Sequence, residues 1–143
     1  MYFLVVIPLY NKEEHIRRAI HSVLAKTHQE FEVIVVDDGS TDSSYEEVKR
    51  PKDARVKVII KQNGGVASAR NHGIWYASYD YIGFLDADDA WKPDFLAIIN
   101  DLIKKYPRAG AYGAAYEFVH SMPVLNAQRL HLIYTIVLVA AAA

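Results

Sequence analysis

Three aspartates, Asp86, Asp88 and Asp89, occupy a short stretch directly after the apolar run 81–85. In an extended segment, side chains two positions apart point to the same side, so Asp86 and Asp88 are expected to face the same way. Two like charges ~4 Å apart cost roughly 1 kcal/mol in water and about 4 kcal/mol near a protein surface. A raised pKa or a bound cation relieves such repulsion, and Mg²⁺ or Mn²⁺ takes one or two carboxylates together with substrate phosphates. The alternative is a solvated turn in which Asp89 caps the next helix.

A second acidic pair, Asp37 and Asp38, follows the apolar run 31–36 and opens a stretch rich in Gly, Ser, Thr and Asp. These residue types are typical of turns, and Asp42 or Ser43 is a suitable cap for the helix that follows. We therefore expect one aspartate of the pair to hold the turn. The other is expected to accept a hydrogen bond from a ligand, such as a nucleobase N–H or a ribose hydroxyl.

Tyr10 and Arg70 offer a ring and a cation that a nucleotide would use. Tyr10 follows the first apolar run and is able to pack against a base, although an aromatic residue in that place more often packs against protein. Arg70 lies in a helical pattern that begins after Gly64 and Gly65. The start of that helix presents backbone N–H groups to an anion, and Arg70 adds a charged fork toward a diphosphate. A surface arginine, or a partner for Asp86, is an equally good interpretation.

The elements that must position these side chains alternate along the chain. Continuous apolar runs predict strands at 3–7, 31–36, 56–60, 81–85 and 111–119. Helical spacing predicts helices at 11–26, 43–50, 66–77 and 93–106. Asn11 with Glu14, and Ser43 with Glu46, are expected to form capping pairs.

This alternation predicts an α/β fold with a parallel central sheet and helices on both faces. In such sheets, ligands bind beyond the carboxyl ends of the strands. Three of the predicted strands therefore bring Tyr10 and the two acidic clusters to one edge of the sheet, which is where we expect a site.

Composition excludes several classes of protein. The 143 residues contain no cysteine, which excludes a disulfide scaffold, a thiolate zinc site and a cysteine nucleophile. Lys and Arg number 16 against 17 Asp and Glu, a net charge of −1 that lacks the basic excess of a nucleic-acid binder. The apolar run after Met1 is too short for a signal peptide. The apolar tail 132–143 is likewise shorter than the ~20 residues of a spanning helix.

Four blocks of the sequence together resemble the family 2 glycosyltransferases, in the family's order and with its spacing. The blocks are Val6-Ile7-Pro8-Leu9-Tyr10-Asn11, Val35-Val36-Asp37-Asp38-Gly39-Ser40-Thr41-Asp42, Asn63-Gly64-Gly65-Val66-Ala67-Ser68-Ala69-Arg70-Asn71 and Phe84-Leu85-Asp86-Ala87-Asp88-Asp89. The resemblance extends over about residues 3–118. It implies the Rossmann-like GT-A fold, a nucleotide-diphospho-sugar donor, a divalent metal (Mn²⁺ or Mg²⁺) and inverting transfer of a hexosyl group.

The resemblance also implies roles for six residues. It places Pro8 and Tyr10 in the base pocket and gives Asp38 a hydrogen bond to the base, which is uracil in many relatives. It places Arg70 near the nucleotide, Asp86 toward the ribose or the metal, and Asp88 on the metal that holds the diphosphate.

Relatives continue well past this length, and their later part supplies the acceptor site and the carboxylate that acts as general base. We therefore expect residues 1–120 to form the donor-binding half of a GT-A domain, and 121–143 remain unassigned. That second segment contains no Asp or Glu, so no general base is identified and the acceptor region is expected to be missing.

The expected partners are a nucleotide-diphospho-sugar, with UDP-sugar first, and a carbohydrate or lipid-linked acceptor of surface polysaccharide or glycan synthesis. We expect no nucleic acid, and a cytoplasmic location with peripheral association at the inner face of the cytoplasmic membrane left open. Two other functions stay open. One is a non-catalytic module that binds nucleotide sugars, and the other is a phosphotransfer enzyme that uses Asp86.

Overall fold

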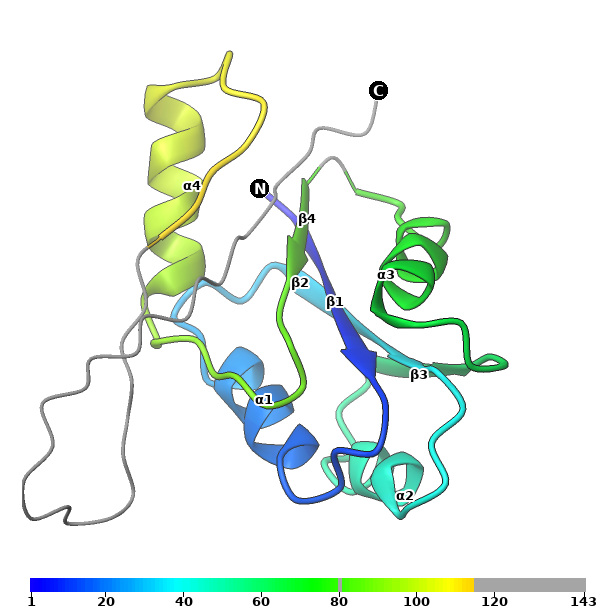
Figure 1. Ribbon diagram of the computed structural model, residues 1–143. Helices are drawn as coiled ribbons and strands as arrows, with labels where there is room; N and C mark the ends of the chain where they lie inside the picture. Colours follow the sequence, from blue (N-terminus) through cyan, green and yellow to red (C-terminus); the bar gives the residue numbers. More distant parts are fainter. Residues whose placement is uncertain (80, 115–143) are drawn as a thin grey trace, which may run out of the picture.

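The computed structural model describes residues 1–79 and 81–114, in which four strands alternate with four helices (Figure 1). The strands are β1 (Phe3–Leu9), β2 (Phe31–Asp37), β3 (Val56–Ile60) and β4 (Tyr81–Phe84). The helices are α1 (Ile16–Leu24), α2 (Ser44–Lys49), α3 (Val66–Ile74) and α4 (Phe95–Lys105). All strand pairs are parallel, in the order β3-β2-β1-β4, so the predicted α/β class is confirmed.

β1 lies inside the sheet because every one of its side chains is apolar. All seven residues are buried, and the strand pairs with β2 on one side and β4 on the other. Phe3 is level with Phe31 and with Tyr81, so the three strands start together and their carboxyl ends reach the same edge.

Side chains alternate between the two faces of β1, and each face is covered by different helices. Phe3, Val5, Ile7 and Leu9 belong to a core with apolar residues of α1, α2 and α4. Leu4 and Val6 point the other way, into a smaller core that includes Ala69 of α3. Figure 1 shows α3 across the sheet from α1 and α4, so helices cover both faces as predicted.

α3 approaches the sheet closely because Gly73 has no side chain. A Cβ atom at Gly73 would lie 2.4 Å from Cγ1 of Val6 and 3.3 Å from Cγ2 of Val36. This close contact sets the position of α3, whose first turn borders the site described below.

Both predicted capping pairs are wrong, although the helices lie where they were expected. α1 starts only at Ile16, because Asn11 has a positive φ of 48° and its Oδ1 accepts the Thr41 N–H at 2.8 Å. Ser43 occupies the N-cap of α2 without a side-chain bond. Oδ1 of Asp42 instead accepts the Ser44 N–H at 3.0 Å, which confirms the alternative of Asp42 as the cap.

Two predictions concern the end of the chain. No strand occurs at 111–114, and the rest of the predicted strand 111–119, like the segment 121–143, lies outside the described residues. Within residues 1–79 and 81–114, none of the helices has the length and apolar character needed to cross a membrane.

Candidate functional site

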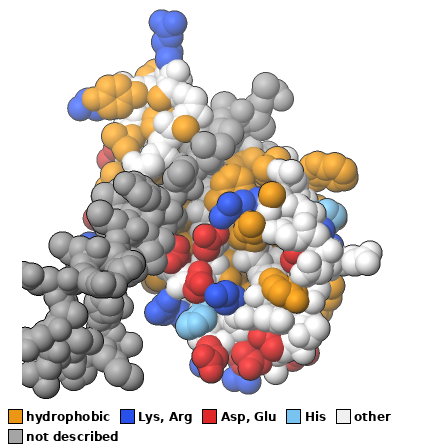
Figure 2. Space-filling model, in the orientation of Figure 1, with side chains coloured by type: hydrophobic (Ala, Val, Ile, Leu, Met, Phe, Trp, Pro, Cys, Tyr) orange, Lys and Arg blue, Asp and Glu red, His pale blue; other side chains and the backbone are white. Residues whose placement is uncertain are grey.

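A pocket of about 420 Å³ opens where β1, β2 and β4 end. Five of the six predicted site residues line it: Pro8, Tyr10, Asp38, Asp86 and Asp88. Lys12, Asn63, Gly65 and Val66 also contribute to its wall. Figure 2 shows acidic and basic side chains close together on this face of the molecule. The predicted meeting of the strand ends at one edge of the sheet is therefore confirmed, and the function of the pocket there stays a prediction.

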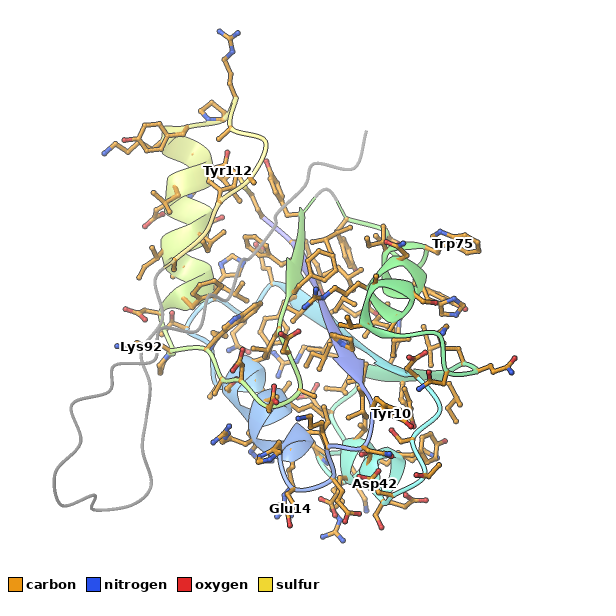
Figure 3. All side chains as sticks on the ribbon, viewed as in Figure 1. Tyr10, Glu14, Asp42, Trp75, Lys92 and Tyr112 are labelled. Carbon is orange, nitrogen blue, oxygen red and sulfur yellow. The ribbon has the colours of Figure 1, made fainter. Side chains whose placement is uncertain are left out.

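Tyr10 follows the last residue of β1 and presents an open ring to the pocket (Figure 3). Pro8 is buried in the strand, whereas Tyr10 is 49% exposed. A ring with that much open surface does not serve the core, so the interpretation as plain packing is wrong. An aromatic face at a pocket wall is suited to stacking on a flat ligand.

One aspartate of the pair Asp37 and Asp38 holds the turn, as predicted, and the other faces the pocket, where its bond to a ligand stays a prediction. Oδ1 of Asp37 accepts the Ser40 N–H at 2.9 Å and so holds the turn after β2. Asp38 lines the pocket, although it is only 2% exposed.

The Asp38 carboxylate is held by its own chain on several sides. It accepts Nζ of Lys61 at 2.6 Å and the N–H groups of Gly64 and Gly65 at 3.0 Å and 2.7 Å. Burial acts to raise the pKa of Asp38, but these hydrogen bonds outweigh it and the pKa lies below its ordinary value. Asp38 therefore stays ionised and fixes the loop from which α3 starts, where Gly65 adopts a φ of 88°.

Arg70 does not line the pocket itself but bonds a residue that does. Its Nη2 donates to Oδ1 of Asp86 at 2.6 Å, which confirms the interpretation of Arg70 as a partner of Asp86. Its guanidinium carbon lies 5.9 Å from the centroid of the Phe84 ring at the end of β4. α3 and β4 are thus joined at the pocket by one ion pair, whose two side chains are 38% and 48% exposed.

Asp88 is paired with a lysine from the other side of the pocket. Nζ of Lys12 donates to Oδ2 of Asp88 at 2.8 Å, and Arg18 donates to the Asp88 backbone carbonyl. The bond from Lys12 holds the pKa of Asp88 below its ordinary value, and the same bond raises the pKa of Lys12. Of the two alternatives for relieving the repulsion, a raised pKa is therefore wrong for Asp88.

Cations from other elements offset the repulsion expected between the neighbouring aspartates. Arg70 neutralises Asp86 and Lys12 neutralises Asp88. Across residues 1–79 and 81–114, no group of three or more Asp, Glu or His side chains gathers to hold a metal ion. Two half-exposed carboxylates at a pocket wall still fit a divalent ion that takes its remaining ligands from a phosphorylated substrate.

Two cations of the site were not predicted from the sequence: Lys12, which lines the pocket, and Lys61, which is paired with the pocket residue Asp38. Lys61 directly follows β3, and Lys12 lies three residues beyond the end of β1. The rule that located the aspartates, that ligands bind at the carboxyl ends of parallel strands, applies equally to these lysines.

Known proteins resemble this chain both in sequence and in fold. Residues 4–133 match the family model described as glycosyl transferase family 2. The chain is 35% identical over 119 residues to glycosyltransferase GlyA of Streptococcus pneumoniae, a match that covers 82% of this chain and 17% of that protein. It is 40% identical over 95 residues to the putative teichuronic acid biosynthesis glycosyltransferase TuaG of Bacillus subtilis, with 64% of this chain and 38% of that protein covered.

Among solved structures, S. aureus TarS 1-349 in complex with UDP-GlcNAc is similar with a TM-score of 0.70 and 31% identity, over 75% of this chain and 32% of that one. The mannosyltransferase PcManGT from Pyrobaculum calidifontis, in complex with GDP-Man and Mn²⁺, has a TM-score of 0.67 at 24% identity, over 78% and 33% of the two chains. The second likeness concerns the fold alone.

The chain spans 17% of the length of GlyA and 38% of that of TuaG, well under two thirds of either relative. Within that span, it shares the GT-A fold with TarS, as the sequence predicted. Since the family model covers most of the residues, the chain belongs to family 2 of the glycosyltransferases.

Proposed function

We propose that the pocket at the strand ends binds the nucleoside diphosphate of a sugar donor, and that the chain contributes the donor-binding part of an inverting glycosyltransferase. The observation that carries this proposal is a pocket with three aspartates, each paired with a cation, beside an open aromatic ring. A nucleotide sugar needs a flat surface for its base, acceptors for its ribose and base N–H groups, and charges of both signs for a metal-bound diphosphate.

The base is proposed to lie between Pro8 and Tyr10, within reach of Asp38. Tyr10 offers an open face for stacking, and Asp38 remains ionised and so acts as a hydrogen-bond acceptor. An acceptor at this place suits uracil, whose N3 carries a proton. UDP-sugars are therefore our first candidates as donors, in line with the bound UDP-GlcNAc of TarS.

Asp88 is proposed to hold a divalent ion, Mn²⁺ or Mg²⁺, with Asp86 facing the ribose or the same ion. PcManGT, which has the same fold, was solved in complex with GDP-Man and Mn²⁺. When bound, such an ion supplies a Lewis acid that stabilises the charge on the departing diphosphate. Arg70, which is paired with Asp86 next to the pocket, is proposed to orient that carboxylate and to add positive charge behind it.

Inverting transfer also needs a general base to take the proton of the acceptor hydroxyl. None of the six residues is assigned that role, and the acceptor is proposed to be a carbohydrate or a lipid-linked sugar of surface polysaccharide synthesis. The name of TuaG, a teichuronic acid biosynthesis glycosyltransferase, supports that kind of pathway. Family membership removes the support for phosphotransfer through Asp86.

Calorimetry tests the proposal with UDP-, GDP- and dTDP-sugars in the presence of Mn²⁺ and then of EDTA. We expect UDP-sugar to bind with Mn²⁺ and to lose affinity in EDTA. Mutation of outer-shell residues already weakens metal sites about 10–100-fold, so Asp88→Asn should weaken metal-dependent binding by roughly tenfold or more. Asp101→Asn, which removes an exposed acid of α4 that lies 3.9 Å from Nζ of Lys104, is the matched control. Equal donor affinity in wild type and Asp88→Asn would count against the assignment.

A measurement of turnover, added to the binding titrations, separates an enzyme from a binding module. A chain that binds UDP-sugar with metal but neither transfers nor hydrolyses it would be a non-catalytic module. Radiolabelled sugar, followed into acceptor and into free sugar, distinguishes the two.

A further inference from the structure

Among the described residues, Lys12 is the one lysine that lines the pocket together with Asp86 and Asp88. Its Nζ lies 2.8 Å from Oδ2 of Asp88, and the two side chains are 42% and 45% exposed. The pair therefore bridges the pocket from the loop after β1 to the loop after β4. It occupies one of the two carboxylates that a divalent ion would need.

The backbone of Lys12 is fixed, whereas its side chain has room to move. The Lys12 N–H donates to Oγ of Ser44 at 2.9 Å, and its carbonyl accepts the N–H groups of His15 and Ile16, both at 3.0 Å. These bonds hold residue 12 against the starts of α1 and α2. The half-exposed ammonium is free to change partners without movement of the chain.

A metal ion and the Lys12 ammonium compete for Asp88. Both are cations, so a divalent ion on the Asp88 carboxylate repels an ammonium at hydrogen-bond distance from it. Arg18 does not enter this competition, because it bonds the Asp88 backbone carbonyl and leaves the carboxylate to Lys12. The negative charge of a donor diphosphate offers the displaced ammonium a new partner in the same pocket.

We propose that Lys12 is a further donor-binding residue that exchanges partners, bonded to Asp88 in the free protein and to the donor diphosphate once a divalent ion occupies Asp88. This inference rests on the proposed function. A metal ion that binds alone must break the Lys12–Asp88 pair, and a diphosphate that binds Lys12 alone must break the same pair. When both bind, the free-energy cost of breaking the pair is incurred only once. Each ligand therefore raises the affinity of the protein for the other.

Titration of Mn²⁺, followed by electron paramagnetic resonance of the free ion, tests the exchange in the absence and presence of UDP. In Lys12→Met we expect Mn²⁺ alone to bind roughly two- to fivefold more tightly, because the ion no longer has to break an exposed ion pair in order to bind Asp88. The coupling, meaning the ratio of the Mn²⁺ dissociation constants without and with UDP, should fall by at least about the same factor. Lys12→Arg keeps the charge and should resemble wild type.

Lys57→Met is the matched control. Lys57 is also exposed and also ion-paired, to Glu32, but it lies at the other end of the sheet, where β2 and β3 begin. Its loss should leave both Mn²⁺ affinity and the coupling unchanged. Circular dichroism and urea unfolding of each variant verify that the fold is intact.

The outcomes separate this inference from the proposed function. If wild type binds Mn²⁺ and UDP cooperatively but Lys12→Met binds Mn²⁺ no more tightly, the exchange is wrong and the donor site stands. If wild type binds neither Mn²⁺ nor UDP, both proposals are overturned. If Lys57→Met also binds Mn²⁺ more tightly, the effect comes from the general loss of positive charge. That result overturns the proposed role of Lys12 and leaves the donor site unaffected.

Discussion

Removal of the Asp38 carboxylate should unfold the loop that forms one wall of the pocket. Asp38→Ala leaves the Lys61 ammonium, whose side chain is 16% exposed, without its partner at 2.6 Å. It also leaves the N–H groups of Gly64 and Gly65 without their acceptor. We therefore expect a loss of stability in addition to any loss of donor binding.

The size of that loss follows from how deeply the pair is buried. Removal of one partner of a buried ion pair costs about 3–5 kcal/mol, and Lys61 retains some access to water, so about 3 kcal/mol is expected. That is a large part of the ~5–15 kcal/mol that stabilises an ordinary domain. Asp38→Asn keeps an oxygen acceptor and should cost less, about 1–2 kcal/mol. Lys61→Met in the Asp38→Ala background removes the stranded charge and should restore part of the loss.

Urea unfolding at pH 7, followed by circular dichroism, measures these differences, with Asp101→Ala as an exposed control expected within about 0.5 kcal/mol of wild type. The pKa of Asp38 is lowered in the folded state, so its contribution is present above its ordinary pKa. The difference in free energy of unfolding between wild type and Asp38→Asn should therefore decrease as the pH falls through the pKa of Asp38 in the folded protein. A loss below about 1 kcal/mol for Asp38→Ala, or a double variant no more stable than the single one, would refute the reasoning.

Three further predictions concern packing and titration. Gly73→Ala should lose roughly 1–2 kcal/mol in urea unfolding, because overpacking against Val6 exceeds the ~1 kcal/mol gain in helix propensity, and Val6→Ala should be less harmful in that background than in wild type. Burial lowers the pKa of Lys26 from 10.5 to about 8, so the charged form of Lys26 lowers the free energy of unfolding, with its full effect below pH 8. The stability of wild type relative to Lys26→Met should then rise by up to about 3 kcal/mol toward pH 10.5, and a flat difference would contradict this. Hydrogen bonds from Arg55 lower the pKa of Asp53 to about 2. Asp53→Asn should therefore lower the free energy of unfolding by roughly 1–2 kcal/mol at pH 7. Chemical denaturation should show this difference disappearing as the pH falls from 3.8 to 2.

The strands were predictable because burial on both faces leaves a simple mark in the sequence. Continuous apolar runs located β1 to β4 to within two residues at their ends. The start of α1 was not predictable in the same way. Asn11 resembles a helix cap by residue type, but its side chain bonds Thr41, which is 30 positions away along the chain. A contact between distant segments decides the helix boundary, and local spacing does not record it.

The pocket shows a similar division between what the sequence carries and what only the fold reveals. Asp86 and Asp88 were placed at a strand end correctly, because strand ends follow from the apolar runs. Their pairing with Arg70 and Lys12 depends on the neighbour order of the strands and on the position of α3. Whether Arg70 lay on the surface or against Asp86 could not be decided from the sequence, and the ion pair decides it.

The central place of β1 has a consequence for synthesis of the protein on the ribosome. β1 is made first, yet its second neighbour, β4, ends only at Phe84. At ~5–20 residues per second, roughly several seconds pass in which a wholly apolar strand has one open edge. A nascent chain in that interval offers a binding place for a chaperone, and mutations that delay β4 should raise aggregation during expression before they alter the finished protein.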